Sequence, residues 1–174
     1  MENPIAISML NDFIFCPISI YFHKLYDGIE NVIFQNSFQL NGTKVHKSID
    51  ENTYSAPFTI KNIEVYSSLY NLIGKIDIYN KKTETLIERK KCITTIYDGY
   101  VFQLYAQYFA MTEMGYSVKY LQIHSIDSNK TYPIALPMDN IEMFSKFKKL
   151  LNNIKEFTID NFIQPNKKKC CMCL

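Results

Sequence analysis

Gly74-Lys75-Ile76-Asp77 and Leu86-Ile87-Glu88-Arg89-Lys90 stand on either side of the polar turn Asn80-Lys81-Lys82-Thr83. Extended chain on both sides of such a turn predicts two paired strands. On a strand, residues two apart share a face, so Glu88 and Lys90 should point the same way, with Arg89 on the other side. The hairpin should also bring Asp77 beside Glu88.

This grouping of two carboxylates and one ammonium group predicts a catalytic metal site. Carboxylates that converge on one point repel each other, and a divalent cation such as Mg²⁺ or Mn²⁺ holds them best. The ion can polarise a phosphate and lower the pKa of a bound water. Lys90 could then orient that water or stabilise charge in the transition state. The alternative is a solvated hairpin with alternating charges, because short motifs often occur by chance.

The remaining pattern predicts a mixed α/β domain, with a small central sheet and helices packed around it. We expect one domain over residues 1–174, because we find neither an internal repeat nor a linker. The first expected helix is capped by Ser8 and ends near Phe15, and the second is opened by Pro17 and covers Ile18–Leu25. Two more are expected over Phe38–Ile49 and over Gly99–Met114, the latter ended by Gly115. The last is capped by Asp139, and its apolar face carries Met143, Phe144, Phe147, Leu151 and Ile154. The strands are expected at Ile60–Tyr66, Tyr70–Tyr79 and Glu84–Lys91, followed by a hairpin of Ser117–Ser125 and Thr131–Leu136.

Three further polar side chains are candidates for the same site. His46 lies in an expected helix, where an imidazole is either a metal ligand or a structural or surface residue. Gln103 and Gln107 are one helical turn apart and share a face, with Tyr100 one turn before them. Their amides could bind DNA phosphates or the carboxylates of the site. The alternative is an ordinary polar stripe on a helix.

The cysteines form a second group. Cys170 and Cys173 have the C-x-x-C spacing that lets two thiolates reach one metal, whereas Cys16 lies near the opposite end of the sequence. The alternatives are a buried, small apolar role for Cys16 and a disordered tail for the C-terminal cysteines. We expect Cys92, which follows the charged strand, in the core.

Composition and charge narrow the function classes only a little. The net charge of +2 neither indicates nor excludes a nucleic-acid partner. Apolar runs are too short to span a membrane, and Met1-Glu2-Asn3-Pro4 does not look like a signal peptide. We therefore expect a cytoplasmic protein with reduced thiols and no membrane partner.

Taken together, the order of these motifs resembles one family, the CRISPR-associated RecB-like nucleases, which are the fourth Cas family of the PD-(D/E)xK superfamily. The resemblance spans nearly the whole chain. Its motifs are Leu10-Asn11-Asp12-Phe13-Ile14-Phe15-Cys16-Pro17, His46, Gly74-x-Ile76-Asp77, Glu88-x-Lys90, Gln103-Leu104 and Lys169-Cys170-x-x-Cys173.

The resemblance implies a RecB-like nuclease core and a Mg²⁺- or Mn²⁺-dependent DNA exonuclease that trims prespacer DNA for the CRISPR integrase complex. The substrate would be single-stranded ends or overhangs of DNA. It also implies that the metal is held by His46, Asp77, Glu88 and the backbone carbonyl of Arg89. Lys90 would be the catalytic lysine, and Gln103 would belong to the RecB-type glutamine motif.

A [4Fe–4S] cluster is implied as well, with Cys16, Cys170 and Cys173 as ligands. It would join residues 1–30 and 160–174 in an iron–sulfur subregion. The family has a fourth cysteine a few residues after the C-x-x-C pair, and this sequence stops at Leu174, before that position. We therefore expect a truncated chain, a labile cluster with three ligands, or a lost cluster.

A second departure concerns the glutamine motif, which usually has a tyrosine four residues on, where this chain has Gln107. Two alternative functions stay open at this point. One is a RecB-like nuclease of DNA repair or phage origin. The other is a non-catalytic DNA-binding subunit of the CRISPR adaptation complex.

Overall fold

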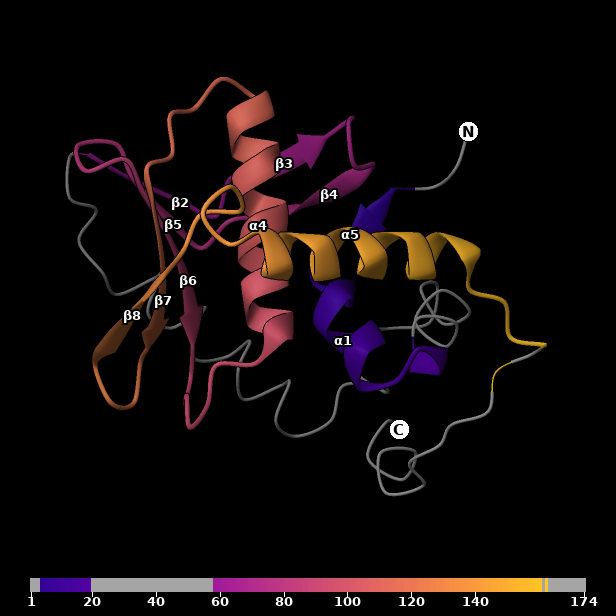
Figure 1. The fold of residues 1–174 in the computed structure, drawn as a ribbon. Coiled ribbons are helices and arrows are strands. Elements are labelled where there is room, and N and C mark those ends of the chain that lie inside the picture. Colours follow the sequence, from indigo (N-terminus) through magenta and orange to yellow (C-terminus); the bar gives the residue numbers. More distant parts are fainter. Residues whose placement is uncertain (1–3, 20–57, 161, 163–174) are drawn as a thin grey trace.

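The computed structural model describes residues 4–19, 58–160 and 162 (Figure 1). Over these ranges the fold is mixed α/β, as the sequence predicts. The elements are β1 (Ile5–Ala6), α1 (Met9–Phe15), β2 (Thr59–Lys61), β3 (Glu64–Ser67), β4 (Leu72–Lys75), β5 (Ile78–Asn80), β6 (Thr85–Lys90), α4 (Asp98–Glu113), β7 (Tyr120–Ser125), β8 (Lys130–Ile134) and α5 (Ile141–Glu156). None of the helices in these ranges is long and apolar enough to cross a membrane.

The described strands form two mixed sheets rather than one. The smaller has the order β1-β4-β3, and the larger has the order β2-β5-β6-β7-β8. Within them β1 is parallel to β4 and β6 is parallel to β7, while the other neighbours are antiparallel. Figure 1 shows α4 between the larger sheet and the strands β3 and β4.

The prediction of single strands over Ile60–Tyr66 and Tyr70–Tyr79 is wrong, because each stretch divides between the two sheets. In the first, Asn62 has a φ of 56°, a left-handed conformation that asparagine tolerates and that ends β2. In the second, the chain leaves the smaller sheet after Lys75 and enters the larger one at Ile78. The Ile76 amide still donates to the Ile63 carbonyl at 3.1 Å, so the break between β2 and β3 lies beside the break between β4 and β5. They leave Asp77 between the sheets.

The strand predicted for Glu84–Lys91 is confirmed as β6, and the polar turn before it is confirmed too. The Asn80 side chain accepts hydrogen bonds from the amides of Lys82 and Thr83 at 2.9 and 3.2 Å. From β6 the chain passes through α4 to the parallel neighbour β7, which is the strand–helix–strand connection that parallel pairing requires. This connection lays α4 across the end of β6 that carries the charged residues.

The two long helices begin and end close to the predicted residues. Gly115, with a φ of 89°, follows α4 as expected. The cap of α5 is Asn140, whose side chain accepts from the Met143 amide at 3.0 Å. The prediction of Asp139 is wrong by one residue, because Asp139 belongs to the preceding turn and donates its amide to the Leu136 carbonyl.

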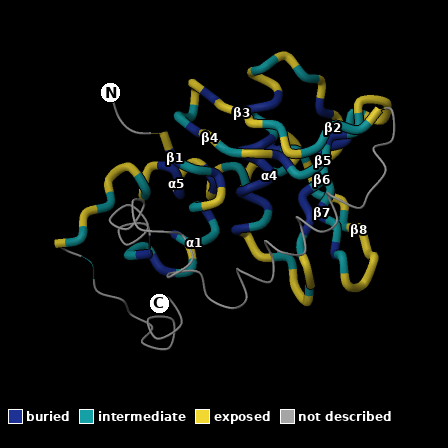
Figure 2. Tube along the Cα trace, turned by 180° about the vertical axis from the view of Figure 1, so that it is seen from behind, coloured by how far each residue is buried: buried dark blue, intermediate teal, exposed yellow. Residues whose placement is uncertain are grey.

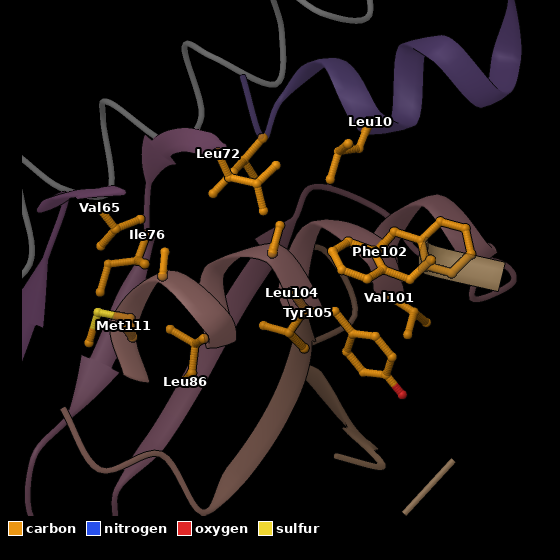
Figure 3. Close-up of a cluster of buried hydrophobic side chains, with 14 of the residues drawn as sticks. Leu10, Val65, Leu72, Ile76, Leu86, Val101, Phe102, Leu104, Tyr105 and Met111 are labelled. Atoms are coloured by element: carbon orange, nitrogen blue, oxygen red, sulfur yellow. The ribbon is translucent and has the colours of Figure 1, made fainter. Parts of the chain in front are cut away.

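The core lies where α4 meets both sheets and the helices α1 and α5. Figure 2 shows buried residues along α4, and Figure 3 shows side chains of Leu10, Leu72, Leu86, Leu104 and Tyr105 in one cluster. From α5, the fully buried Phe147 contacts the rings of Phe102, Tyr105 and Phe109, with centroids 6.0 to 6.1 Å apart. Of the helix predicted for Ile18–Leu25 only two residues are described, and that for Phe38–Ile49 lies outside the described residues.

Candidate functional site

Asp77 lies at the bend between β4 and β5, directly against the end of β6. The antiparallel register pairs Ile78 with Ile87, which brings Asp77 level with Glu88 and Arg89. The Oδ2 atom of Asp77 accepts the backbone amide of Arg89 at 2.7 Å. The expectation that a hairpin brings Asp77 beside Glu88 is therefore confirmed.

Glu88 and Lys90 share one face of β6, as their spacing predicts. The Nζ atom of Lys90 lies 2.8 Å from Oε1 of Glu88. The same Nζ donates to Oε1 of Gln103 at 2.7 Å and lies 5.0 Å from the centre of the Tyr100 ring. The ammonium group is thus held by a carboxylate, an amide oxygen and an aromatic face.

Both glutamines of α4 point into the site. Gln107 donates from Nε2 to Oε2 of Glu88 at 2.7 Å and to the Lys75 carbonyl at 3.3 Å. Gln103, besides accepting from Lys90, donates to the Ser8 carbonyl at 3.4 Å. Their exposed fractions are only 8% and 3% for Gln103 and Gln107, so the alternative of an exposed polar stripe is wrong. Two amides one turn apart hold the two charged residues of one strand.

The charges in this cluster favour a protonated Lys90. Burial by itself lowers the pKa of Lys90, but the charge of Glu88 and its hydrogen bond, together with Asp77, outweigh burial and raise that pKa overall. On the far side of β6, the buried Arg89 side chain has its Nε atom 4.0 Å from Oδ2 of Asp77. Each of the two carboxylates therefore lies against a cationic side chain.

A cavity of about 300 Å³ opens at this cluster. Its polar lining comes from Ser8, Lys75, Asp77, Glu88, Gln103 and Gln107. Each carboxylate oxygen has two lone-pair positions, so the hydrogen bonds from Lys90 and Gln107 leave further acceptor capacity on Glu88. Two hard oxygen donors beside a cavity suit Mg²⁺ or Mn²⁺. No group of three or more His, Cys, Asp or Glu side chains able to hold a metal occurs among the described residues.

Several predicted ligands lie outside the part of the chain that the structure describes. His46, Cys170 and Cys173 lie outside the described residues, as does most of the predicted iron–sulfur subregion. Cys16 is described, and it is fully buried at the end of α1, where its amide donates to the Asp12 carbonyl at 2.8 Å. Cys92 is exposed, so its expected place in the core is wrong. It lies after the end of β6, where the chain runs out of the sheet toward α4.

One wall of the cavity comes from a segment that the sequence did not indicate. Ala6, Ile7 and Ser8 line it, because β1 pairs with β4 through Ile5 and Leu72. A two-residue strand has no recognisable periodicity. The only available signal is Gly74, where a Cβ atom would stand 2.9 Å from Cβ of Ile7, since a glycine inside a strand often marks a close backbone approach.

Comparisons with known proteins bear on the fold alone. The chain matches no protein-family model and no curated protein. Among solved structures it is similar to the crystal structure of SSO0001, with a TM-score of 0.65 and 16% sequence identity over 100% of this chain and 84% of that one.

Proposed function

We propose that this chain is a metal-dependent deoxyribonuclease of the PD-(D/E)xK superfamily with a RecB-like core. The observation that carries the proposal is one cavity lined by Asp77, Glu88 and Gln103, with Lys90 bonded to both Glu88 and Gln103. A solvated hairpin with alternating charges does not account for this arrangement, because Glu88 is only 7% exposed. Burying charged groups costs free energy, so a cluster of enclosed charges suggests a function that needs them.

Asp77, Glu88 and the carbonyl of Arg89, together with His46 from outside the described residues, would hold Mg²⁺ or Mn²⁺. When bound, the ion supplies Lewis acidity toward a phosphate and a water of lowered pKa. The donor chemistry fits, because two carboxylate side chains line one cavity and hard oxygen donors suit these ions.

Lys90 acts in this proposal as a cation and hydrogen-bond donor. The charge and hydrogen bond of Glu88, together with Asp77, outweigh burial and raise the pKa of Lys90, which favours this protonated form. Two of its three N–H bonds point at Glu88 and Gln103. In this proposal the third would donate to a phosphate oxygen or an attacking water, and the two fixed bonds would orient it.

The resemblance to the CRISPR-associated nucleases suggests the substrate and the process. The chain would trim single-stranded ends or overhangs of prespacer DNA, in the cytoplasm, for a CRISPR integrase complex. A [4Fe–4S] cluster at Cys16, Cys170 and Cys173 is a separate part of this proposal. The burial of Cys16 suits an enclosed thiolate ligand and a small apolar residue equally, so the cleavage chemistry is argued without the cluster.

The test is cleavage of end-labelled single-stranded DNA with Mg²⁺ or Mn²⁺, in wild type and in Lys90→Met. We expect the variant to lose activity by about a hundredfold or more, which corresponds to roughly 3 kcal/mol of activation free energy. Lys149→Met, on an exposed part of α5, is the matched control and should cleave normally. Thermal melting of both variants separates lost chemistry from lost folding.

One outcome would contradict the assignment of the site, and another would contradict the catalytic activity. Wild-type rates in Lys90→Met would show that the site is misassigned. A wild-type chain that binds DNA but cleaves none with either metal would favour the non-catalytic alternative.

A further inference from the structure

Glu88 is held at both of its carboxylate oxygens, and the two partners come from different elements. Lys90, on the same strand, donates to Oε1, and Gln107, on α4, donates to Oε2. The terminal torsion of a glutamate is soft, so a single hydrogen bond leaves the plane of the carboxylate free to turn. A second donor at the other oxygen fixes that plane.

The orientation of the Gln107 amide follows from its neighbours. Oε2 of Glu88 and the carbonyl of Lys75 are both acceptors, so the NH₂ group must face them. The other end of the amide, Oε1, is buried and accepts no hydrogen bond within the described part of the chain. An unsatisfied buried oxygen costs about 1–3 kcal/mol, so the donor end must account for the presence of an amide here.

We propose that Gln107 is a positioning residue that fixes the Glu88 carboxylate for divalent metal binding. The inference rests on the proposed function, in which Glu88 is a metal ligand. Gln107 acts through Glu88, because the group that faces Glu88 is the NH₂ group, which cannot bind a cation. Groups that orient a metal ligand in this way typically change metal affinity by about 10- to 100-fold when they are removed.

The experiment measures Mn²⁺ binding directly, by calorimetry or by the electron paramagnetic resonance signal of free Mn²⁺, on the full chain without DNA. Gln107→Met keeps the length and flexibility of the side chain and removes the donor. We expect it to bind Mn²⁺ about 10- to 100-fold more weakly than wild type. Gln107→Asn keeps the amide on a shorter stem and should fall between the two.

The matched control is Gln122→Met on β7. Gln122 is paired with Ile87, whereas Glu88 is paired with Ile123, so Gln122 faces the side of the sheet away from the site. This variant should bind Mn²⁺ as wild type does. If Gln107→Met has the predicted defect, cleavage at saturating Mn²⁺ should recover to within a few-fold of wild type, which a damaged fold would not allow.

The outcomes separate the inference from the function beneath it. Equal Mn²⁺ affinity in wild type, Gln107→Met and Gln107→Asn would overturn the role of Gln107 while leaving the nuclease proposal in place. A wild-type chain that binds no Mn²⁺ would overturn both. A defect in Gln107→Met that persists at saturating metal, with a matching fall in melting temperature, would assign Gln107 to the fold instead.

Discussion

The helices α4 and α5 have the same length, 16 residues each, and bury their surfaces in different ways. In α4 ten residues are buried, spread around the helix, and two of them are Gln103 and Gln107. In α5 only Phe147, Leu150 and Leu151 are buried, on one stripe. On a helix that is buried around most of its circumference, a buried polar side chain stands out, so the amides of α4 indicate the site. The polar residues of α5 lie outside its buried stripe and give no such indication.

The largest expected loss of stability is at the contact between α5 and α4. Phe147→Ala should lower the free energy of unfolding by about 3–5 kcal/mol, because the ring is fully buried and its removal leaves a cavity. Urea unfolding measures this, with Lys149→Ala on the exposed face of α5 as the control. A loss below about 1 kcal/mol would mean that α5 is not anchored to α4 by this ring.

A smaller effect is expected where α4 approaches α1. A Cβ atom at Gly99 would stand 2.3 Å from Oδ1 of Asn11 and 3.3 Å from its Cα atom. Gly99→Ala gains about 1 kcal/mol of helix propensity and incurs about 1–3 kcal/mol of overpacking, so we expect a net loss near 1 kcal/mol.

The double variant Asn11→Ala/Gly99→Ala tests the cause of that loss. Removing the Asn11 amide relieves the shorter contact, so the double variant should be more stable than the sum of the single changes predicts. Additive losses in urea unfolding would show that the strain lies elsewhere.

The smallest change in stability is expected for substitutions on the exposed face of α5. Glu142 and Lys146 form an ion pair of 2.9 Å, one helical turn apart and open to solvent. Glu142→Gln should leave the urea midpoint at pH 7 unchanged within error, because such pairs contribute little. The hydrogen bond from Lys146 lowers the pKa of Glu142, so any contribution exists above the unfolded pKa and disappears as the pH falls through the folded one. A clear shift of the midpoint at pH 7 would contradict this view of α5.

The parts of the fold that were predicted correctly from the sequence are those that depend on local sequence pattern. The apolar spacing of α5, the turn at Asn80 and the strand β6 all depend on residues within a few positions of one another. The shared face of Glu88 and Lys90 follows from strand geometry in the same way. The single strands predicted around Asn62 and Ile76 failed, because the division depends on two sheets whose separation is a tertiary feature.

The site shows the same limit. Asp77, Glu88, Lys90 and Gln103 were predicted together and line or adjoin one cavity. The wall formed by Ala6, Ile7 and Ser8 was missed, because it depends on how elements distant in sequence are oriented. The bond from Gln107 to Glu88 was predicted only as one of two roles for the amides of α4, for the same reason. Cys92 was misplaced because a cysteine next to a buried strand was assumed to share its burial, although the chain leaves the sheet there.

The pairing of β1 with β4 has a consequence for synthesis of the protein. Ile5 leaves the ribosome before Leu72 and can pair with it only after the intervening chain has been translated. Non-local pairings of this kind carry a loop-closure cost and form late. The cavity wall at Ala6, Ile7 and Ser8 can therefore form only after β4 has been synthesised. The helix α4, which carries the two glutamines that hold Glu88 and Lys90, is synthesised after β4. A nascent chain that ends before α4 has neither glutamine to hold its charged strand.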